Sequence, residues 1–113
     1  MRGYGGMIGT RKLGHATCKL CVPKALPADM RTDVVELINL KTKPNKRGHG
    51  YAKALLVSVC NEADQAKRFL LLQVRASGPM GLQDLANLYI RNGFQPIQAE
   101  PLLMLRPFAG AYG

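Results

Sequence analysis

The sequence predicts an α/β (α+β) fold whose central element is a strand–helix–strand (βαβ) unit. Residues 33–42 alternate as a strand does, residues 50–68 carry an apolar stripe of helical period, and residues 69–74 are apolar on both faces. Apolar residues on both faces are typical of a central strand that is covered on both sides. This order of elements predicts two parallel strands joined by a right-handed crossover.

Length and composition indicate one globular domain over residues 1–113, with 47% hydrophobic and 20% charged residues. No apolar run approaches the ~20 residues that cross a membrane. No secretory signal is visible at the N-terminus. We therefore expect a cytoplasmic location.

The segment before the βαβ unit contains one further predicted strand. Residues 1–14 are glycine-rich and basic, and we expect them to be flexible. Residues 15–23 are predicted to form a short strand, one face of which carries Ala16, Cys18, Leu20 and Val22. In the strand over residues 33–42, one face carries Val34, Glu36, Ile38, Leu40 and Thr42. Its other face carries Val35, Leu37, Asn39 and Lys41.

The helix over residues 50–68 presents one apolar stripe, formed by Ala52, Leu55, Leu56, Val59, Cys60, Ala63 and Ala66. After the strand at 69–74, a second helix is predicted over residues 82–92. Gly93 stands where a left-handed C-cap belongs. Two short strands, residues 94–97 and 102–106, then flank a turn.

The net charge of +9 predicts an anionic partner. Nucleic acid is one candidate, but the chain has 6% aromatic residues and no Trp, so it supplies few rings on which bases could stack. Coenzyme A, with a pyrophosphate and a 3′-phosphate, is another. The densest basic segment, residues 41–53, lies around a glycine-rich loop, which favours a phosphate-bearing cofactor.

The three cysteines predict no metal centre. Cys18 and Cys21 have metal-ligand spacing, but no second pair follows, and His15 and His49 would at most complete an improvised site. Cys18 instead fits the inner face of the strand at 15–23. An odd number of cysteines also fits a reducing compartment.

The most informative feature is the run Arg47-Gly48-His49-Gly50-Tyr51-Ala52, which lies between a predicted strand and a predicted helix. Backbone N–H groups in such a loop can converge on one anion, and the helix dipole reinforces them. Gly48 and Gly50 remove Cβ atoms that would block a phosphate, and Arg47 adds a permanent cation. A solvated strand–helix turn is the alternative interpretation.

The spacing Arg-x-x-Gly-x-Ala resembles the acetyl-CoA pyrophosphate loop of the GNAT family of N-acetyltransferases. A second motif agrees with it, because Tyr89 followed by Gly93-Phe94 resembles the last helix of that family, and residues 104–107 resemble its final strand. The resemblance covers about residues 33–107. It implies a mixed central sheet whose parallel strands splay apart at their C-terminal ends, with a truncated N-terminal part.

The resemblance also implies an acetyl-CoA site. Backbone groups of Leu40, Lys41 and Thr42 would pair with the pantetheine arm in the gap between the splayed strands. Backbone N–H groups at Gly48, His49, Gly50, Tyr51 and Ala52 would hold the pyrophosphate. An acceptor amine would then attack the thioester directly, so positioning would carry much of the acceleration.

Two residues are candidates for the proton transfers. Tyr89 matches the position of the family's general acid, which protonates the departing thiolate; a core aromatic is the alternative role. Glu36 is the only carboxylate within the strand at 33–42 and is the candidate general base. The alternatives are a solvated or salt-bridged Glu36 and a water relayed by backbone carbonyls. We expect His49 to be solvent-exposed rather than catalytic.

The chain departs from the family pattern in two ways. Leu82 occupies a position where the family often has an Asn that bonds the pantetheine arm, and Gln83 and Asn87 are the alternatives for that role. Fewer residues precede the strand at 33–42 than in most members, so the acceptor side is expected to be open. An open side suits a protein lysine or N-terminus as acceptor, or a second subunit that completes the site.

Three functional hypotheses follow from the sequence. An acetyl-CoA-dependent N-acetyltransferase fits the two motifs best. A catalytically silent acyl-CoA-binding or protein-interaction module on the same fold is the first alternative, favoured by Leu82 but not by Tyr89. A small basic nucleic-acid-binding protein is the second alternative, favoured by the charge alone.

Overall fold

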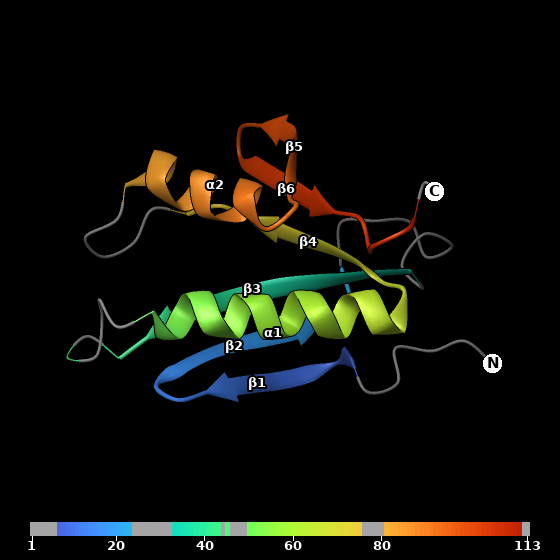
Figure 1. Cartoon of the computed structure of the whole chain (residues 1–113). Helices are drawn as coiled ribbons and strands as arrows, with labels where there is room; N and C mark the ends of the chain where they lie inside the picture. The colour runs from blue at the N-terminus through green and yellow to red at the C-terminus, as the bar shows by residue number, and fades with distance from the viewer. Residues whose placement is uncertain (1–6, 24–32, 44, 46–49, 76–80, 112–113) are drawn as a thin grey trace.

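The computed structural model describes residues 7–23, 33–43, 45, 50–75 and 81–111, and it confirms the mixed α/β fold (Figure 1). Its elements in chain order are β1 Gly9–Leu13, β2 Ala16–Cys21, β3 Val34–Thr42, α1 Tyr51–Ala66, β4 Phe69–Gln73, α2 Leu82–Arg91, β5 Gln95–Ala99 and β6 Leu102–Arg106. The strands form one six-stranded sheet in the order β1-β2-β3-β4-β6-β5. Strands β3 and β4 are parallel and the other neighbours are antiparallel, so the predicted βαβ unit is confirmed.

The N-terminal segment contains a strand that the sequence did not indicate. We expected residues 1–14 to be flexible, but Gly9–Leu13 pairs with β2 along its whole length as β1. A turn at Gly14, with φ of 59°, joins the two strands. Strand β1 lacks the alternation of apolar and polar residues that would have predicted it. The residue that contacts α1 from this strand is the charged Arg11, whose guanidinium donates to the carboxylate of Glu62.

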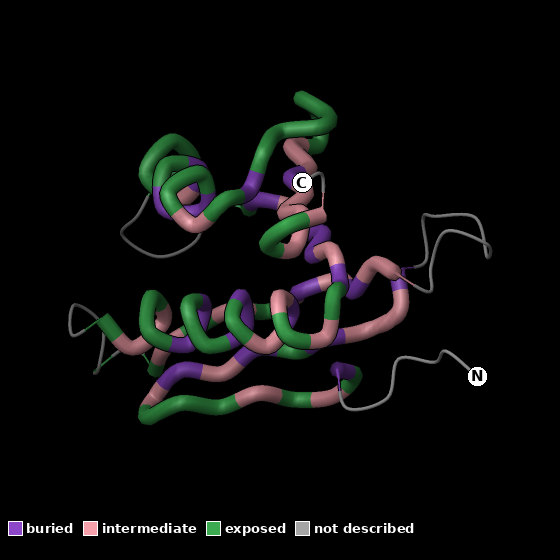
Figure 2. Tube along the Cα trace, turned by 45° about the vertical axis from the view of Figure 1, so that its right-hand side comes forward, coloured by how far each residue is buried: buried purple, intermediate pink, exposed green. Residues whose placement is uncertain are grey.

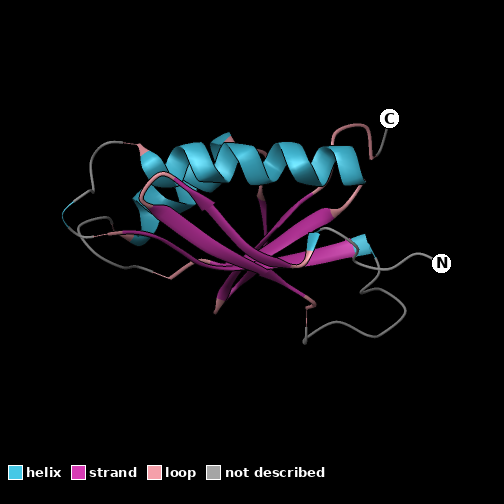
Figure 3. Cartoon of the chain, turned by 90° about the horizontal axis from the view of Figure 1, so that it is seen from below, coloured by secondary structure: helices cyan, strands magenta, loops and turns pink. Residues whose placement is uncertain are grey.

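The hydrophobic core lies between one face of the sheet and the helices. Residues of α1, α2 and strands β2, β3, β4 and β6 form a single buried cluster, so both helices cover the same face (Figure 3). The predicted stripe of α1 is confirmed, with Leu55, Leu56, Val59, Cys60 and Ala63 buried. Burial is concentrated in the middle of the sheet, whereas β5 is exposed along its length (Figure 2). Neither described helix is long and apolar enough to span a membrane.

Strand β3 departs from the alternation predicted for it. Lys19 of β2 pairs with Ile38, but Thr17 pairs with Lys41, so β3 contains one extra residue at this point. Asn39 adopts a left-handed conformation with φ of 56°. Such a β-bulge exchanges the two faces of the strand beyond it, and Leu40 consequently packs against the core on the same side as Leu37. The predicted faces are therefore correct before the bulge and wrong after it.

An ion pair lies at the end of the sheet opposite the N-terminus of α1. The guanidinium of Arg106 donates to both carboxylate oxygens of Asp64, at 2.8 and 3.1 Å, and its Nε donates to the carbonyl of Asn92. The backbone N–H of Ala109 also donates to Asp64. These bonds join β6, α1, the end of α2 and the C-terminal segment, and the Arg106 guanidinium lowers the pKa of Asp64.

Candidate functional site

The parallel strands β3 and β4 pair at their N-terminal ends and then separate. Strand β3 pairs with β4 only from Val34 to Glu36, which lies opposite Leu71. Beyond this point β4 continues beside β6, while β3 continues beside β2. A cavity of about 420 Å³ lies in this split, and its lining residues are Glu36, Leu37, Ile38, Asn39, Leu40, Lys41, Leu72, Gln73, Arg75, Leu85 and Tyr89.

The bulge in β3 forms one wall of the cavity. Residues 37–41 all line the cavity, because it follows the edge of β3 and receives residues from both faces of the sheet. Among the described strands, none pairs with the β4-facing edge of β3 after Glu36. An extended ligand in the split could therefore hydrogen-bond this edge as an additional strand does. Of the three residues predicted for that role, Leu40 and Lys41 line the cavity and Thr42 does not.

Tyr89 reaches the cavity from the helix side. The residue lies on the buried face of α2, and only 8% of it is exposed. Its ring packs edge-on against Phe94, with the centroids 5.5 Å apart, and its carbonyl accepts bonds from the N–H groups of Asn92 and Phe94. Burial raises the pKa of Tyr89 above its usual value. The phenol is therefore a protonated donor at neutral pH, and no residue of the described structure hydrogen-bonds its hydroxyl.

Glu36 reaches the same cavity from the opposite side of the sheet. Its neighbours Val35 and Leu37 are buried beneath α1, so by strand alternation Glu36 points away from the helices. The side chain is half-buried, and within the described part of the chain its carboxylate makes no ion pair or hydrogen bond. The cavity therefore lies between a carboxylate on one face of the sheet and a phenol on the other.

Helix α1 begins at the same end of the sheet as the open part of the split (Figure 1). Gly50 is its N-cap and has φ of 78°, a left-handed conformation that glycine adopts without strain. A Cβ added to Gly50 would meet no atom within 4 Å, so the space beside the helix terminus is open. Tyr51 and Ala52 begin the helix, and the Tyr51 ring packs edge-on against His15. The other predicted loop residues, Arg47, Gly48 and His49, lie outside the described residues.

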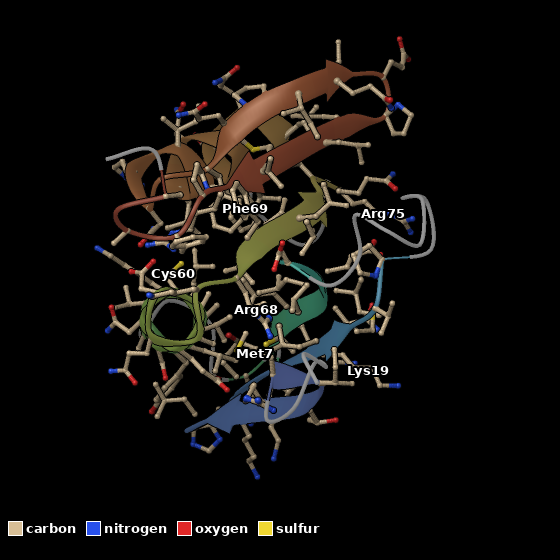
Figure 4. The ribbon with its side chains drawn as sticks, turned by 90° about the vertical axis from the view of Figure 1, so that its right-hand side faces the viewer. Met7, Lys19, Cys60, Arg68, Phe69 and Arg75 are labelled. Atoms are coloured by element: carbon tan, nitrogen blue, oxygen red, sulfur yellow. The ribbon has the colours of Figure 1, made fainter. Side chains whose placement is uncertain are left out.

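Sequence reasoning missed Ile38 and Asn39 at the bulge, and Gln73 and Arg75 at the end of the second parallel strand. Arg75 lies two residues after the end of β4 and donates from Nη2 to the Gln73 side chain at 3.3 Å. Both residues line the cavity. Figure 4 shows Arg75 on the side of the sheet that faces away from α1. The position of Arg75 was the available signal, because ligands of open α/β sheets bind beyond the carboxyl ends of parallel strands.

The amides of α2 do not take the place of the family's Asn. Leu82 is 46% exposed and does not line the cavity. Gln83 donates to Asn87 at 3.1 Å, and both are exposed, away from the cavity. Leu85 and Tyr89 are the residues through which α2 contributes to the cavity.

The two closely spaced cysteines lie on opposite faces of β2. Cys18 is buried in the core, and burial raises its thiol pKa to about 11. Cys21 is half-buried on the other face, where its Sγ lies 3.7 Å from the carbonyl of Glu36. The strand therefore separates the two thiols.

No protein-family model matches the sequence, and no curated protein matches it. Solved structures do match. The ribosomal-protein-S18-alanine N-acetyltransferase of Escherichia coli superposes with a TM-score of 0.64 at 21% identity, covering 96% of this chain and 76% of that one. The anti-CRISPR protein AcrVA5 superposes with a TM-score of 0.63 at 16% identity, covering 87% and 98%.

A third structure contains the cofactor in question. N-acetylglutamate synthase from Neisseria gonorrhoeae, complexed with coenzyme A and L-arginine, superposes with a TM-score of 0.54 at 16% identity, covering 84% of this chain and 22% of that one. The chain spans 53–64% of four further acyltransferases. The fold is therefore that of the GNAT acetyltransferases, as the sequence motifs predicted.

Proposed function

We propose that this chain is an acetyl-CoA-dependent N-acetyltransferase that transfers the acetyl group directly to an amine. The observation that carries the proposal is the pair Glu36 and Tyr89, which line one cavity from opposite faces of the sheet. A base and an acid on opposite sides of a narrow gap suit a reaction in which one proton is removed and another is supplied. The GNAT fold supports the same reaction class.

The described residues fit acetyl-CoA as co-substrate. The volume of the cavity lies within the range of about 300–1,000 Å³ typical of small-molecule sites. The free edge of β3 at Leu40 and Lys41 would pair with the pantetheine arm. The N-terminus of α1, from Gly50 to Ala52, would receive the pyrophosphate together with the preceding Arg47, Gly48 and His49.

The chemistry assigned to the chain consists of two proton transfers. Glu36 accepts the proton that the acceptor ammonium must lose before its nitrogen attacks the thioester carbonyl. As the new C–N bond forms and the C–S bond breaks, Tyr89 donates its proton to the departing sulfur. The second proton, which the nitrogen loses on becoming an amide, passes through solvent and reprotonates Tyr89. The raised pKa of Tyr89 keeps this donor protonated at neutral pH.

The acceptor side is the sheet face opposite the helices, where Glu36 lies. Both described helices cover the other face, so neither of them covers Glu36. A protein lysine or N-terminus is therefore the proposed acceptor, either from another protein or from a second subunit. The three cysteines are free thiols, which fits the reducing cytoplasm as the place of action.

Incubation with acetyl-CoA and a peptide that carries a single amine tests the proposal. We expect equal amounts of free thiol and acetylated peptide, with both falling in Glu36→Gln and in Tyr89→Phe. Binding of acetyl-CoA without transfer to any amine would instead support the catalytically silent module, for which the exposed Leu82 is the structural argument. Absence of acetyl-CoA binding would contradict both functions.

A further inference from the structure

The sheet face opposite the helices carries a group of exposed lysines on its first three strands, Lys12, Lys19 and Lys41, which we call the lysine face. The residues next to each lysine in the sequence lie on the helix side of the sheet. Arg11 reaches α1, Cys18 and Leu20 are buried beneath the helix, and Leu40 packs against the core. By strand alternation the three lysines point to the opposite side, where Figure 4 shows Lys19.

Register places these cations beside the candidate base. Lys12 and Lys41 flank Thr17 on neighbouring strands, so their backbones are about 10 Å apart. Lys19 lies opposite Ile38, and Cys21 lies opposite Glu36, which makes Lys19 and Glu36 diagonal neighbours at about 7 Å. Arg75, at the rim of the cavity, adds a fourth cation on the same side. A single carboxylate thus lies among four cations.

Three of the described acidic residues pair with cations away from this face, one of which is Asp33, whose carboxylate lies 4.0 Å from Arg68. Glu62 and Asp64 of α1 pair with Arg11 and Arg106 on the helix side. Within the described ranges, Lys12, Lys19 and Lys41 form no ion pair. The described part of this face therefore carries uncompensated positive charge around Glu36. Mutual repulsion of these cations destabilises the folded protein unless a partner supplies the opposite charge.

We propose that the lysine face docks an acidic polypeptide segment, so that the acceptor amine is one flanked by Asp or Glu. This inference rests on the proposed function and specifies its acceptor. One carboxylate among cations is the electrostatic complement of one ammonium among carboxylates. Glu36 and Lys41 lie opposite Cys21 and Thr17 of β2, so they are about 13 Å apart, the span of roughly four extended residues. The recognised carboxylates thus lie about two to four residues from the amine.

Nucleic acid fits this surface less well than an acidic polypeptide. The carboxylate of Glu36 repels phosphates, whereas it attracts an ammonium. Strands β1, β2 and β3 carry no Phe, Tyr or Trp on which a base could stack. The cavity beside Glu36 also requires an acceptor that can enter it as a single side chain or chain terminus.

Peptides of equal length that differ only in flanking charge provide the test. One series carries a single lysine and a blocked N-terminus, and a second carries a free N-terminus and no lysine. In each series the flanks are Glu, Gln or Arg. We expect kcat/KM to be about tenfold higher for the Glu peptide than for the Gln peptide, with a further loss for the Arg peptide. The preference should shrink as salt rises, because exposed charges are screened.

Two double variants with the same change in net charge locate the effect. Lys12→Glu with Lys19→Glu should abolish or reverse the preference for the Glu peptide. Lys67→Glu with Arg91→Glu changes exposed cations on the helix side and should retain it. Equal behaviour of the two double variants, or equal kcat/KM for all three flanks, would overturn the inference while leaving the acetyltransferase function intact.

Binding of fluorescently labelled peptides to the protein with coenzyme A gives a readout that needs no turnover. If no amine is acetylated, the proposed function fails, but tighter binding of the Glu peptide, lost in Lys12→Glu with Lys19→Glu only, still supports the acidic docking surface. Binding of duplex DNA that is tighter than that of the Glu peptide at physiological salt would assign the lysine face to nucleic acid and overturn the inference.

Discussion

Replacing Tyr89 by phenylalanine removes one hydroxyl from the cavity and leaves the aromatic ring in place. The ring retains its edge-on contact with Phe94 and its position on the buried face of α2. No described residue loses a hydrogen bond, so no buried partner is left unsatisfied. We therefore expect the free energy of unfolding to change by less than about 1 kcal/mol.

The effect of Tyr89→Phe on turnover should be much larger. General acid catalysis is worth about 10²–10⁴-fold, and the thiolate of coenzyme A is already a tolerable leaving group. We expect kcat to fall by about 100-fold, which corresponds to about 2.7 kcal/mol in the activation free energy, with the affinity for acetyl-CoA unchanged. Thiol release measured at saturating acceptor, together with calorimetry of acetyl-CoA binding, gives both quantities.

The pH dependence of kcat provides a second readout of the same group. The acid must be protonated, and burial raises the pKa of Tyr89 above its usual value near 10. The wild type should therefore retain its kcat up to about pH 10 and lose it above, whereas Tyr89→Phe should show no loss in that range. An unchanged kcat in the variant would refute the general-acid role and leave Tyr89 as a packing residue.

Three other changes have defined outcomes. Gly50→Val introduces a β-branched residue at a φ of 78° and a Cβ beside the N-terminus of α1, so acetyl-CoA binding measured by calorimetry should be lost together with some stability. Asparagine tolerates this backbone conformation, so Gly50→Asn should retain the stability of the wild type and weaken acetyl-CoA binding only. Asp64→Asn should lower the free energy of unfolding in urea by about 1–3 kcal/mol at pH 7; because the pKa of Asp64 is lowered in the folded state, the wild type should lose this contribution as pH falls below about 4. Iodoacetamide at pH 8 should label Cys21 and spare Cys18 and Cys60, whose burial raises their pKa to about 11, as peptide mass spectrometry would show.

Each of these three predictions has its own control or contrary result. Equal acetyl-CoA affinity in Gly50→Val and the wild type would remove the terminus of α1 from the cofactor site. Asp84→Asn alters an exposed acid in the first turn of α2 and should cost much less stability than Asp64→Asn. Labelling of Cys18 at the same rate as Cys21 would show that the face of β2 beneath α1 opens to solvent.

The elements of the βαβ unit could be predicted because their buried faces require apolar residues at regular intervals in the sequence. Helix α1 buries a stripe at three- and four-residue steps, and β4 is covered on both faces. Gly93 follows the C-cap Asn92 of α2 and has φ of 95°, the left-handed conformation that was predicted for it. Tyr89 could be singled out because it matches the general-acid position of the family that the sequence resembles, and Glu36 because it is the only carboxylate within the strand at 33–42.

The bulge in β3 and strand β1 produce no such regular pattern of apolar residues. Ile38, Asn39 and Leu40 alternate between apolar and polar as a regular strand does, so the exchange of faces at Asn39 is not visible without the pairing partner. Strand β1 is an edge strand held by Arg11 rather than by apolar contacts. The cavity depends on both features of β3, its bulge and its early separation from β4, and therefore could not be outlined from local sequence alone.

We propose that acetyl-CoA binds in the split between β3 and β4, between Glu36 and Tyr89. A crystal structure of the protein with a non-reactive acetyl-CoA analogue would show this position directly. We predict that the atom replacing the thioester sulfur lies within about 3.5 Å of the Tyr89 hydroxyl, with the acetyl group directed toward the Glu36 side of the sheet. An analogue bound elsewhere, or one whose acetyl group points away from both residues, would contradict the account.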